Sequence, residues 1–184
     1  MAGSVSNQNT ANQLHIFLDI DGVLGDFDLH ARQQGKLTAD GKVKYSALDY
    51  AWWATMPATE GARDFYDAML KIGAVRFLTG PILNEECFSG KAHWVQEFVP
   101  ERGKGAMKDL IICASGDKAY LAGPRRILVD DRIANVNAWI AAGGIGIHHT
   151  GDFGETLKKL QAAIAPTSAP AKKRGLGGIF PKFQ

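Results

Sequence analysis

The sequence has little cysteine and no long apolar run. Its 184 residues include only two cysteines, Cys87 and Cys113, which lie far apart and form no CxxC pair. Two cysteines cannot build a disulfide framework or a cysteine-based zinc site. One disulfide between them is an alternative, but we expect two buried, reduced thiols. No stretch of about 18 apolar residues exists, and we expect no membrane span. Residues 1–13 lack the basic start and apolar stretch of a secretory signal, which favours a cytoplasmic protein.

The sequence also lacks a strong excess of either charge. Its 21 Lys and Arg residues and 19 Asp and Glu residues give a formal net charge of +2. The segment 166–184 holds no acidic residue but four basic ones: Lys172, Lys173, Arg174 and Lys182. The rest of the chain is therefore slightly acidic, which argues against nucleic-acid binding by the folded part. We predict a disordered lead at 1–13 and a flexible basic tail at 166–184.

Apolar runs alternate with helical patterns through the middle of the chain. The runs predict buried strands at 14–20, 74–80, 108–115, 125–131 and 144–150. Apolar residues at helical spacing predict helices at 60–73, 84–99, 131–144 and 155–165. This alternation predicts an α/β fold with a doubly wound, Rossmann-like parallel sheet of about five strands.

Residues 25–57 interrupt the alternation. They are too many for a simple connection between the first strand and the helix at 60. They include the aromatic-rich stretch KVKYSALDYAWWATMP, which favours helix. We therefore predict one core domain over 14–165, with 25–57 as a small helical cap inserted above the strand ends.

Polar residues end three of the predicted strands. Asp19 and Asp21 lie at the end of the first strand in IFLDIDGVLGDF, Thr79 ends the second, and Asp130 and Asp131 end RRILVDD. Ligands of parallel sheets bind beyond the carboxyl ends of the strands, so these residues should meet in one crevice. An ionised carboxylate there needs an opposite charge or a metal ion to offset its burial.

Carboxylates without histidine or cysteine beside them favour Mg²⁺, which commonly binds one or two carboxylates together with substrate phosphate. An aspartate can attack phosphorus and form an aspartyl-phosphate. A second carboxylate two residues on can protonate the leaving alcohol and then activate the attacking water. The charge that develops on the phosphoryl oxygens calls for Mg²⁺, a hydroxyl donor such as Thr79, and a lysine.

These features together resemble the haloacid dehalogenase-like phosphatases. The stretches DIDGVL, FLTG and LVDD, with a lysine before the fourth strand, are similar to the four motifs of that family, in the same order, over residues 14 to about 150. The resemblance implies that Asp19 is the nucleophile and a Mg²⁺ ligand. It implies that Asp21 is the general acid and base, with its backbone carbonyl on the metal, and that the Thr79 hydroxyl binds phosphate.

The lysine and the second acidic pair are assigned by the same resemblance. Lys118, in SGDKAY, is the best match for the lysine that holds the phosphate and the nucleophile, with Lys104 and Lys108 as alternatives. Asp130 and Asp131 match the acidic pair, in which one residue binds Mg²⁺ and the other orients a water or Lys118. The nearest subfamily favours Asp131 as the metal ligand.

That subfamily is suggested by finer matches. DGVLGDF, WW, MP, FLTGP and KAHWVQEF are similar to stretches of the 5′(3′)-deoxyribonucleotidases. The resemblance implies that Phe27 flanks the nucleobase and that Trp52 and Trp53 complete an aromatic pocket. Neighbouring residues of a helix point about 100° apart, so at most one of the two tryptophans should face the ligand. Gly80 falls where these enzymes often carry serine, and the cap is shorter than theirs.

The sequence therefore predicts a Mg²⁺-dependent phosphomonoesterase of (deoxy)nucleoside monophosphates that works through an aspartyl-phosphate. The phosphate would lie among Asp19, Thr79, Gly80 and Lys118. One alternative is a related phosphatase of a sugar phosphate or a nucleic-acid 3′-phosphate, and another is a non-catalytic binding protein on the same fold. A homodimer, and docking of another protein through the tail at 166–184, are further hypotheses.

Overall fold

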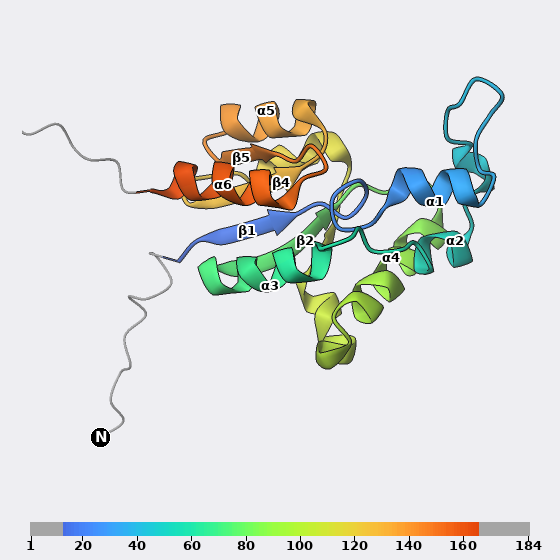
Figure 1. Ribbon diagram of the computed structural model, residues 1–184, viewed down its shortest axis with the longest axis horizontal. Coiled ribbons are helices and arrows are strands. Elements are labelled where there is room, and N and C mark those ends of the chain that lie inside the picture. Colours follow the sequence, from blue (N-terminus) through green and yellow to red (C-terminus); the bar gives the residue numbers. More distant parts are fainter. Residues whose placement is uncertain (1–12, 166–184) are drawn as a thin grey trace, which may run out of the picture.

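The computed structural model describes residues 13–165, so the predictions for residues 1–12 and for the tail at 166–184 lie outside the described part. Five parallel strands form one sheet in the order β3-β2-β1-β4-β5 (Figure 1). The strands are β1 (His15–Leu18), β2 (Ala74–Thr79), β3 (Leu110–Ile112), β4 (Arg126–Asp130) and β5 (Ile145–His148). The predicted five-stranded parallel sheet is confirmed.

Six α-helices accompany the strands within residues 13–165. They are α1 (Phe27–Gln33), α2 (Tyr50–Ala54), α3 (Ala62–Ile72), α4 (Glu85–Phe98), α5 (Ile133–Ala141) and α6 (Phe153–Ile164). Four of them begin after an Asp or Asn whose side chain accepts a hydrogen bond from a backbone N–H of the first turn: Asp26, Asp49, Asn84 and Asp152. No helix of this part of the chain is long and apolar enough to cross a membrane.

Helices cover both faces of the sheet, because alternate residues of a strand point to opposite faces. Leu18 of β1 packs in a buried cluster with Phe65 of α3 and Leu160 of α6. Its neighbour Phe17 packs in a second cluster with Trp139 of α5, where the two ring centroids are 5.2 Å apart. The sheet is therefore doubly wound, and the α/β Rossmann-like class predicted from the sequence is confirmed.

The third strand is shorter than the predicted 108–115. It is one of the two edge strands of the sheet and pairs only with β2. Before it, Asp109 ends the 3-10 helix η2 (Pro100–Asp109) and forms ion pairs with Arg76 and Arg102. The apolar pattern could not reveal this end, because the ion pair to Arg76 joins residues distant in the sequence.

The segment 25–57 lies beyond the carboxyl end of β1, where it forms α1, the 3-10 helix η1 (Tyr45–Ala47) and α2 (Figure 1). His30 of α1 is buried against Trp52 of α2, with ring centroids 4.8 Å apart and 3.1 Å between His30 Nε2 and the Trp52 carbonyl oxygen. Helix α2 in turn packs on α4. Buried aromatic contacts therefore hold this segment together, and α2 attaches it to the core.

Candidate active site

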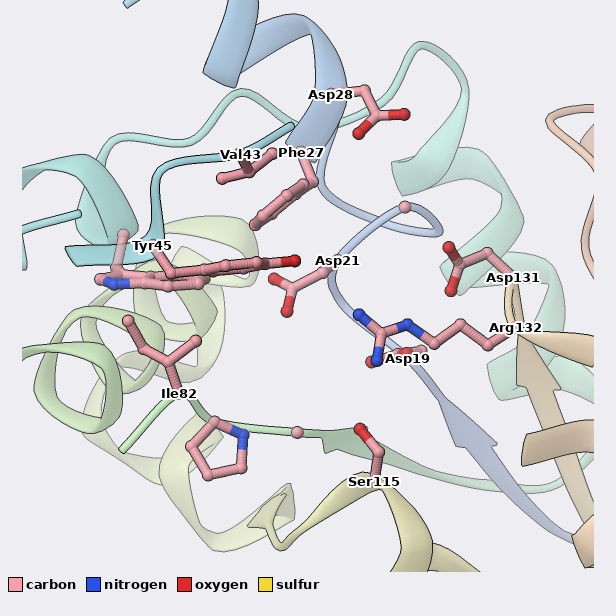
Figure 2. Close-up of a pocket in the computed structure, with 14 residues that line it drawn as sticks. Asp19, Asp21, Phe27, Asp28, Val43, Tyr45, Ile82, Ser115, Asp131 and Arg132 are labelled. Atoms are coloured by element: carbon pink, nitrogen blue, oxygen red, sulfur yellow. The ribbon is translucent and has the colours of Figure 1, made fainter. Parts of the chain in front are cut away.

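A cavity of about 340 Å³ opens where the carboxyl ends of the strands meet the segment 25–57 (Figure 2). Its lining residues are Asp19, Asp21, Gly22, Phe27, Asp28, Val43, Tyr45, Trp53, Gly80, Pro81, Ile82, Ser115, Asp131 and Arg132. We call the polar groups at the strand ends the floor of the cavity, and the side chains of Phe27, Tyr45 and Trp53 its aromatic wall. The volume lies within the range of small-molecule sites.

Asp19 directly follows β1 and is only 5% exposed. Its Oδ1 accepts a hydrogen bond of 2.8 Å from the N–H of Ile20, and its Oδ2 lies 2.8 Å from Lys118 Nζ. Burial raises the pKa of Asp19 to about 7, since the lowering by Lys118 is offset by the nearby carboxylates of Asp130 and Asp21. The ionised form of Asp19 therefore depends on cations beside it.

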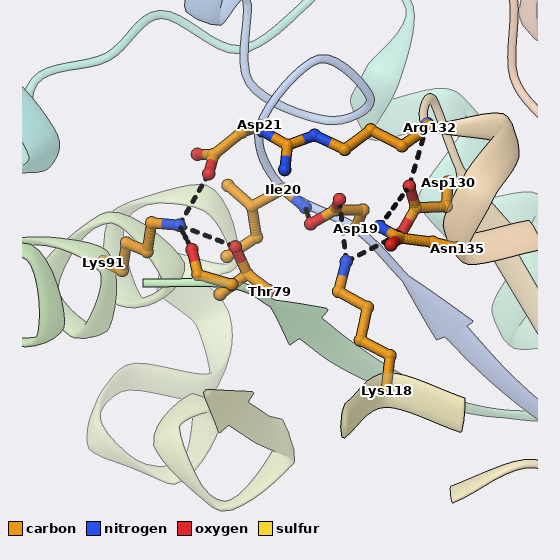
Figure 3. Close-up of polar contacts among 10 residues, drawn as sticks. Asp19, Ile20, Asp21, Thr79, Lys91, Lys118, Asp130, Arg132 and Asn135 are labelled. Atoms are coloured by element: carbon orange, nitrogen blue, oxygen red, sulfur yellow. Dashed lines mark hydrogen bonds and ion pairs between the residues drawn. The ribbon is translucent and has the colours of Figure 1, made fainter. Parts of the chain in front are cut away.

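Lys118 reaches the floor from the 3-10 helix η3 (Ser115–Leu121). Its Nζ lies 2.8 Å from Asp19 Oδ2 and 2.7 Å from Asp130 Oδ2 (Figure 3). Burial by itself lowers the pKa of Lys118, but the two carboxylates raise it above its ordinary value. Lys104 and Lys108 are exposed on η2. The structure thus brings Lys118, rather than either alternative, to Asp19.

The acidic pair after β4 divides into two environments. Asp130 is fully buried; it accepts hydrogen bonds from the Arg132 N–H at 2.9 Å and from Asn135 Nδ2 at 3.0 Å, besides its contact with Lys118. Asp131 lines the cavity, and its Oδ1 is buried without a hydrogen-bond partner among the described residues. Asp130 can therefore orient Lys118, while Asp131 has a ligand atom available.

Three carboxylates of the floor could share a cation. Asp19, Asp130 and Asp131 each offer an oxygen, and these atoms all lie within 4.8 Å of one another. Gly22 permits the close approach, since its φ is +77° and a Cβ there would lie 2.6 Å from Asp131 Oδ2. Three negative charges around one lysine, with oxygen as the donor atom, fit a hard divalent cation such as Mg²⁺ or Ca²⁺.

Asp21 lies on the other side of the floor and pairs with Lys91 of α4. Lys91 Nζ donates to Asp21 Oδ2 at 2.6 Å, to Thr79 Oγ1 at 2.7 Å and to the Gly80 carbonyl oxygen at 2.6 Å (Figure 3). Its three N–H groups therefore have three acceptors, and the ammonium also lies 4.9 Å from the centre of the Trp53 ring. Asp21 Oδ1 is left without a partner among the described residues.

Sequence reasoning missed Lys91, although the sequence contains a signal for it. Cys87, Lys91, Trp94 and Val95 recur at helical spacing, and all four are buried on one side of α4. A lysine on the apolar face of a helix is unusual unless it is paired, so its placement indicates a buried acceptor. The acceptor is Asp21, 70 residues earlier in the chain.

Thr79 lies behind the cavity rather than on its surface. The residue is completely buried at the end of β2 and is not among the lining residues. Its hydroxyl oxygen accepts the hydrogen bond from Lys91, whereas the next residue, Gly80, does line the cavity. Contact between the Thr79 hydroxyl and a substrate stays a prediction.

The aromatic wall includes two of the three predicted residues. Phe27 and Trp53 line the cavity, as does Tyr45, which sequence reasoning did not select. Trp52 is buried but does not line the cavity; its ring lies edge-on to those of Phe27 and Trp53, with centroids 5.1 and 4.7 Å apart. One tryptophan faces the cavity and the other supports it, as the 100° step of a helix requires.

Two further details concern Arg132 and the cysteines. Arg132 lines the cavity, and its side chain extends over the floor (Figure 2). Sequence reasoning did not select this cation. Cys87 and Cys113 are both free, as expected, but only Cys87 is buried; Cys113 is half-buried beside the edge strand, where less of the fold covers it.

Comparison with known proteins supports the fold. No family model and no curated protein matches the chain. Among solved structures, it is similar to an uncharacterized protein from Corynebacterium glutamicum, with 17% identity and a TM-score of 0.48 over 92% of this chain and 100% of that one. It is also similar to a haloacid dehalogenase-like family hydrolase from Xanthomonas campestris, with 13% identity and a TM-score of 0.50 over 77% of this chain and 85% of that one. The protein therefore has the Rossmann-like fold found in a haloacid dehalogenase-like hydrolase.

Proposed function

We propose that this protein is a Mg²⁺-dependent phosphomonoesterase that hydrolyses deoxynucleoside and nucleoside monophosphates. The observation that carries the proposal is the arrangement of the floor. Asp19 is held by Lys118, Asp131 lies beside it, and an unpartnered oxygen of Asp21 belongs to the same cavity. This is the set of groups that transfer of a phosphoryl group to an aspartate requires. The fold shared with a haloacid dehalogenase-like hydrolase supports it.

Asp19 and Asp131 are the side chains that would hold the Mg²⁺ ion, with the backbone carbonyl of Asp21 as a further ligand. When bound, the ion neutralises the negative charge on the phosphoryl oxygens. Asp130 has its oxygens occupied by Lys118, the Arg132 N–H and Asn135, so its part is to orient the lysine.

In the first half of the reaction, a carboxylate oxygen of Asp19 forms a bond to phosphorus, and the bond from phosphorus to the sugar oxygen breaks. Asp21, protonated in the complex, gives its proton to the departing oxygen. In the second half, Asp21 takes a proton from a water molecule as the water attacks phosphorus. The bond between phosphorus and Asp19 then breaks, which releases inorganic phosphate and restores both aspartates.

The two buried lysines hold the reacting carboxylates. Lys118 contacts Asp19 directly and keeps a positive charge next to the nucleophile. Lys91 contacts Asp21 through Oδ2 and leaves Oδ1 as the oxygen that can exchange a proton with the substrate. Because each lysine is 1% exposed or less, water does not weaken these contacts.

The aromatic wall supports a nucleotide as substrate. Phe27, Tyr45 and Trp53 gather at one side of the cavity, with Phe27 6.3 Å from Tyr45 and 6.0 Å from Trp53 between ring centroids. Stacking of a nucleobase on an aromatic side chain is worth about 1–3 kcal/mol in nucleic-acid-binding proteins. A phosphate at Asp19 would leave the rest of the molecule to extend toward these rings.

The test is phosphate release from a panel of phosphomonoesters: deoxynucleoside and ribonucleoside monophosphates, a sugar phosphate, a 3′-phosphorylated oligonucleotide and p-nitrophenyl phosphate. We expect the wild type to hydrolyse the deoxynucleotides with Mg²⁺, and EDTA to stop the reaction. Asp19→Asn should lower kcat by about 10³-fold or more, since the nucleophile is lost. Asp64→Asn, the same change on the exposed side of α3, is the matched control.

Two results would contradict the proposal in different ways. Hydrolysis of p-nitrophenyl phosphate without hydrolysis of any nucleotide would support the phosphatase activity but exclude nucleotides as substrates. If no ester released phosphate, the phosphatase activity itself would be excluded. A non-catalytic binding protein on this fold would then be the better explanation.

A further inference from the structure

Ser115 presents a hydroxyl to the floor of the cavity. It follows β3 and begins η3, the same short helix that carries Lys118. It lines the cavity, and its side chain points from below toward the floor (Figure 2). Its hydroxyl makes no hydrogen bond to another residue in 13–165, whereas the Thr79 hydroxyl is buried and accepts from Lys91. Of these two hydroxyls, only that of Ser115 is available to a ligand.

The space for this hydroxyl depends on Gly80. A Cβ added at residue 80 would lie 2.5 Å from Ser115 Oγ but 3.6 Å from Ser115 Cβ. A side chain at residue 80 and the hydroxyl at its present position therefore exclude each other, while a methyl group at residue 115 would be an ordinary neighbour. The φ of Gly80 is not positive, so its backbone conformation does not require glycine. The close approach of Ser115 therefore explains why residue 80 is a glycine.

We infer that Ser115 is a phosphate-binding residue: its hydroxyl donates a hydrogen bond to a phosphoryl oxygen of the substrate, and Gly80 leaves the room for it. The inference rests on the proposed function and assigns the donor that faces the phosphoryl group. Thr79 is then a positioning residue, because its hydroxyl holds Lys91, which holds Asp21. A donor fixed at the floor stabilises the negative charge that the phosphoryl oxygens carry through the reaction.

The test is a double-mutant cycle on Ser115 and Gly80, with p-nitrophenyl phosphate as substrate and inorganic phosphate as competitive inhibitor. Ser115→Ala should lower kcat/KM about 10- to 100-fold and raise the inhibition constant of phosphate, as expected for loss of a hydrogen bond to a charged group. Gly80→Ala should cause a similar loss, because its methyl group displaces the hydroxyl. The double variant should be no worse than Ser115→Ala alone, since the methyl group added at residue 80 then has no hydroxyl to displace.

Ser89→Ala is the matched control, because this exposed serine of α4 lies outside the cavity lining. The midpoint of thermal unfolding, measured for every variant, separates lost binding from lost folding. Losses that add in the double variant, or a Ser115→Ala enzyme within twofold of the wild type, would overturn the inference and leave the phosphatase standing. A wild type that hydrolyses no phosphomonoester would overturn the proposed function, and the inference with it.

Discussion

The floor of the cavity and its aromatic wall are held together by different forces. On the floor, Asp19, Lys118 and Asp130 are all at most 5% exposed, and their charged atoms lie 2.7 to 2.8 Å apart. On the wall, Phe27 and Tyr45 have ring centroids 6.3 Å apart, and Tyr45 is 45% exposed. Directional contacts between buried charges tolerate little change, whereas contacts between rings depend mainly on area.

The two parts also come from different regions of the fold. The floor is built by the ends of β1 and β4 and by η3, which belong to the core. The wall comes from the segment 25–57, which packs on the core through α2 and α4. The structure therefore separates the groups proposed for the chemistry from those proposed for substrate choice. Changes on each side should have separate effects, in the following order of size.

The largest effect is expected for Lys118→Met, which removes the cation between Asp19 and Asp130. We expect kcat/KM to fall by at least about 100-fold, since Asp19, the proposed nucleophile, loses its partner. The free energy of unfolding should fall by about 3–5 kcal/mol, because two buried carboxylates lose the cation between them. Phosphate release and urea denaturation measure the two effects. Lys104→Met, on the exposed side of η2, should change neither, and an equal loss there would contradict the place given to Lys118.

A smaller effect is expected for Tyr45→Ala, on the wall. The kcat/KM for deoxynucleotides should fall about 5- to 150-fold, which corresponds to a stacking energy of about 1–3 kcal/mol. The kcat/KM for p-nitrophenyl phosphate should change far less, because that substrate carries no base to stack. Tyr120→Ala, at a tyrosine that is 86% exposed and outside the cavity lining, is the control. An equal loss for both substrates would mean that wall and floor are not independent.

The smallest effect is expected for the pH dependence of stability through His30, which joins α1 to α2. Burial lowers the pKa of His30 below its ordinary value of 6.5, and the hydrogen bond to the Trp52 carbonyl offsets part of the lowering. Below pH 6.5 the unfolded chain therefore binds more protons at this residue than the native protein. The free energy of unfolding should fall as pH drops from 6.5 through the native pKa.

His30→Gln tests this prediction, because glutamine can still donate to the Trp52 carbonyl but does not titrate. Urea denaturation between pH 5.5 and 7.5 should show a flatter slope for this variant than for the wild type. His93→Gln, at an exposed position on α4, should keep the wild-type slope. A His30→Gln slope equal to that of the wild type would show that another group controls the dependence.

Local patterns predicted most of the sheet and its polar ends. Strands β1, β2, β4 and β5 were predicted within two residues of their observed bounds, since burial on both faces leaves a continuous apolar run. The placement of Asp19 and Asp21 after β1 also follows from the sequence, because a carboxylate that interrupts such a run must lie at its end. The edge strand β3 was too long in the prediction at both ends: before it, Asp109 belongs to η2 and forms ion pairs with Arg76 and Arg102, and after it the chain leaves the sheet at Cys113.

By itself, the sequence determined the order of strands and helices along the chain and the strand ends that carry carboxylates. Hydrophobic periodicity and the residues that end strands and helices are local properties of the chain. Only the tertiary structure decided which lysine meets Asp19, that Lys91 holds Asp21, and that Ser115 rather than Thr79 opens onto the cavity. These outcomes depend on contacts between residues far apart in the chain: Lys91 and Asp21 are 70 positions apart, and Lys118 is farther still from Asp19. Periodicity carries no information about such pairs, because the packing of helices against the sheet brings them together.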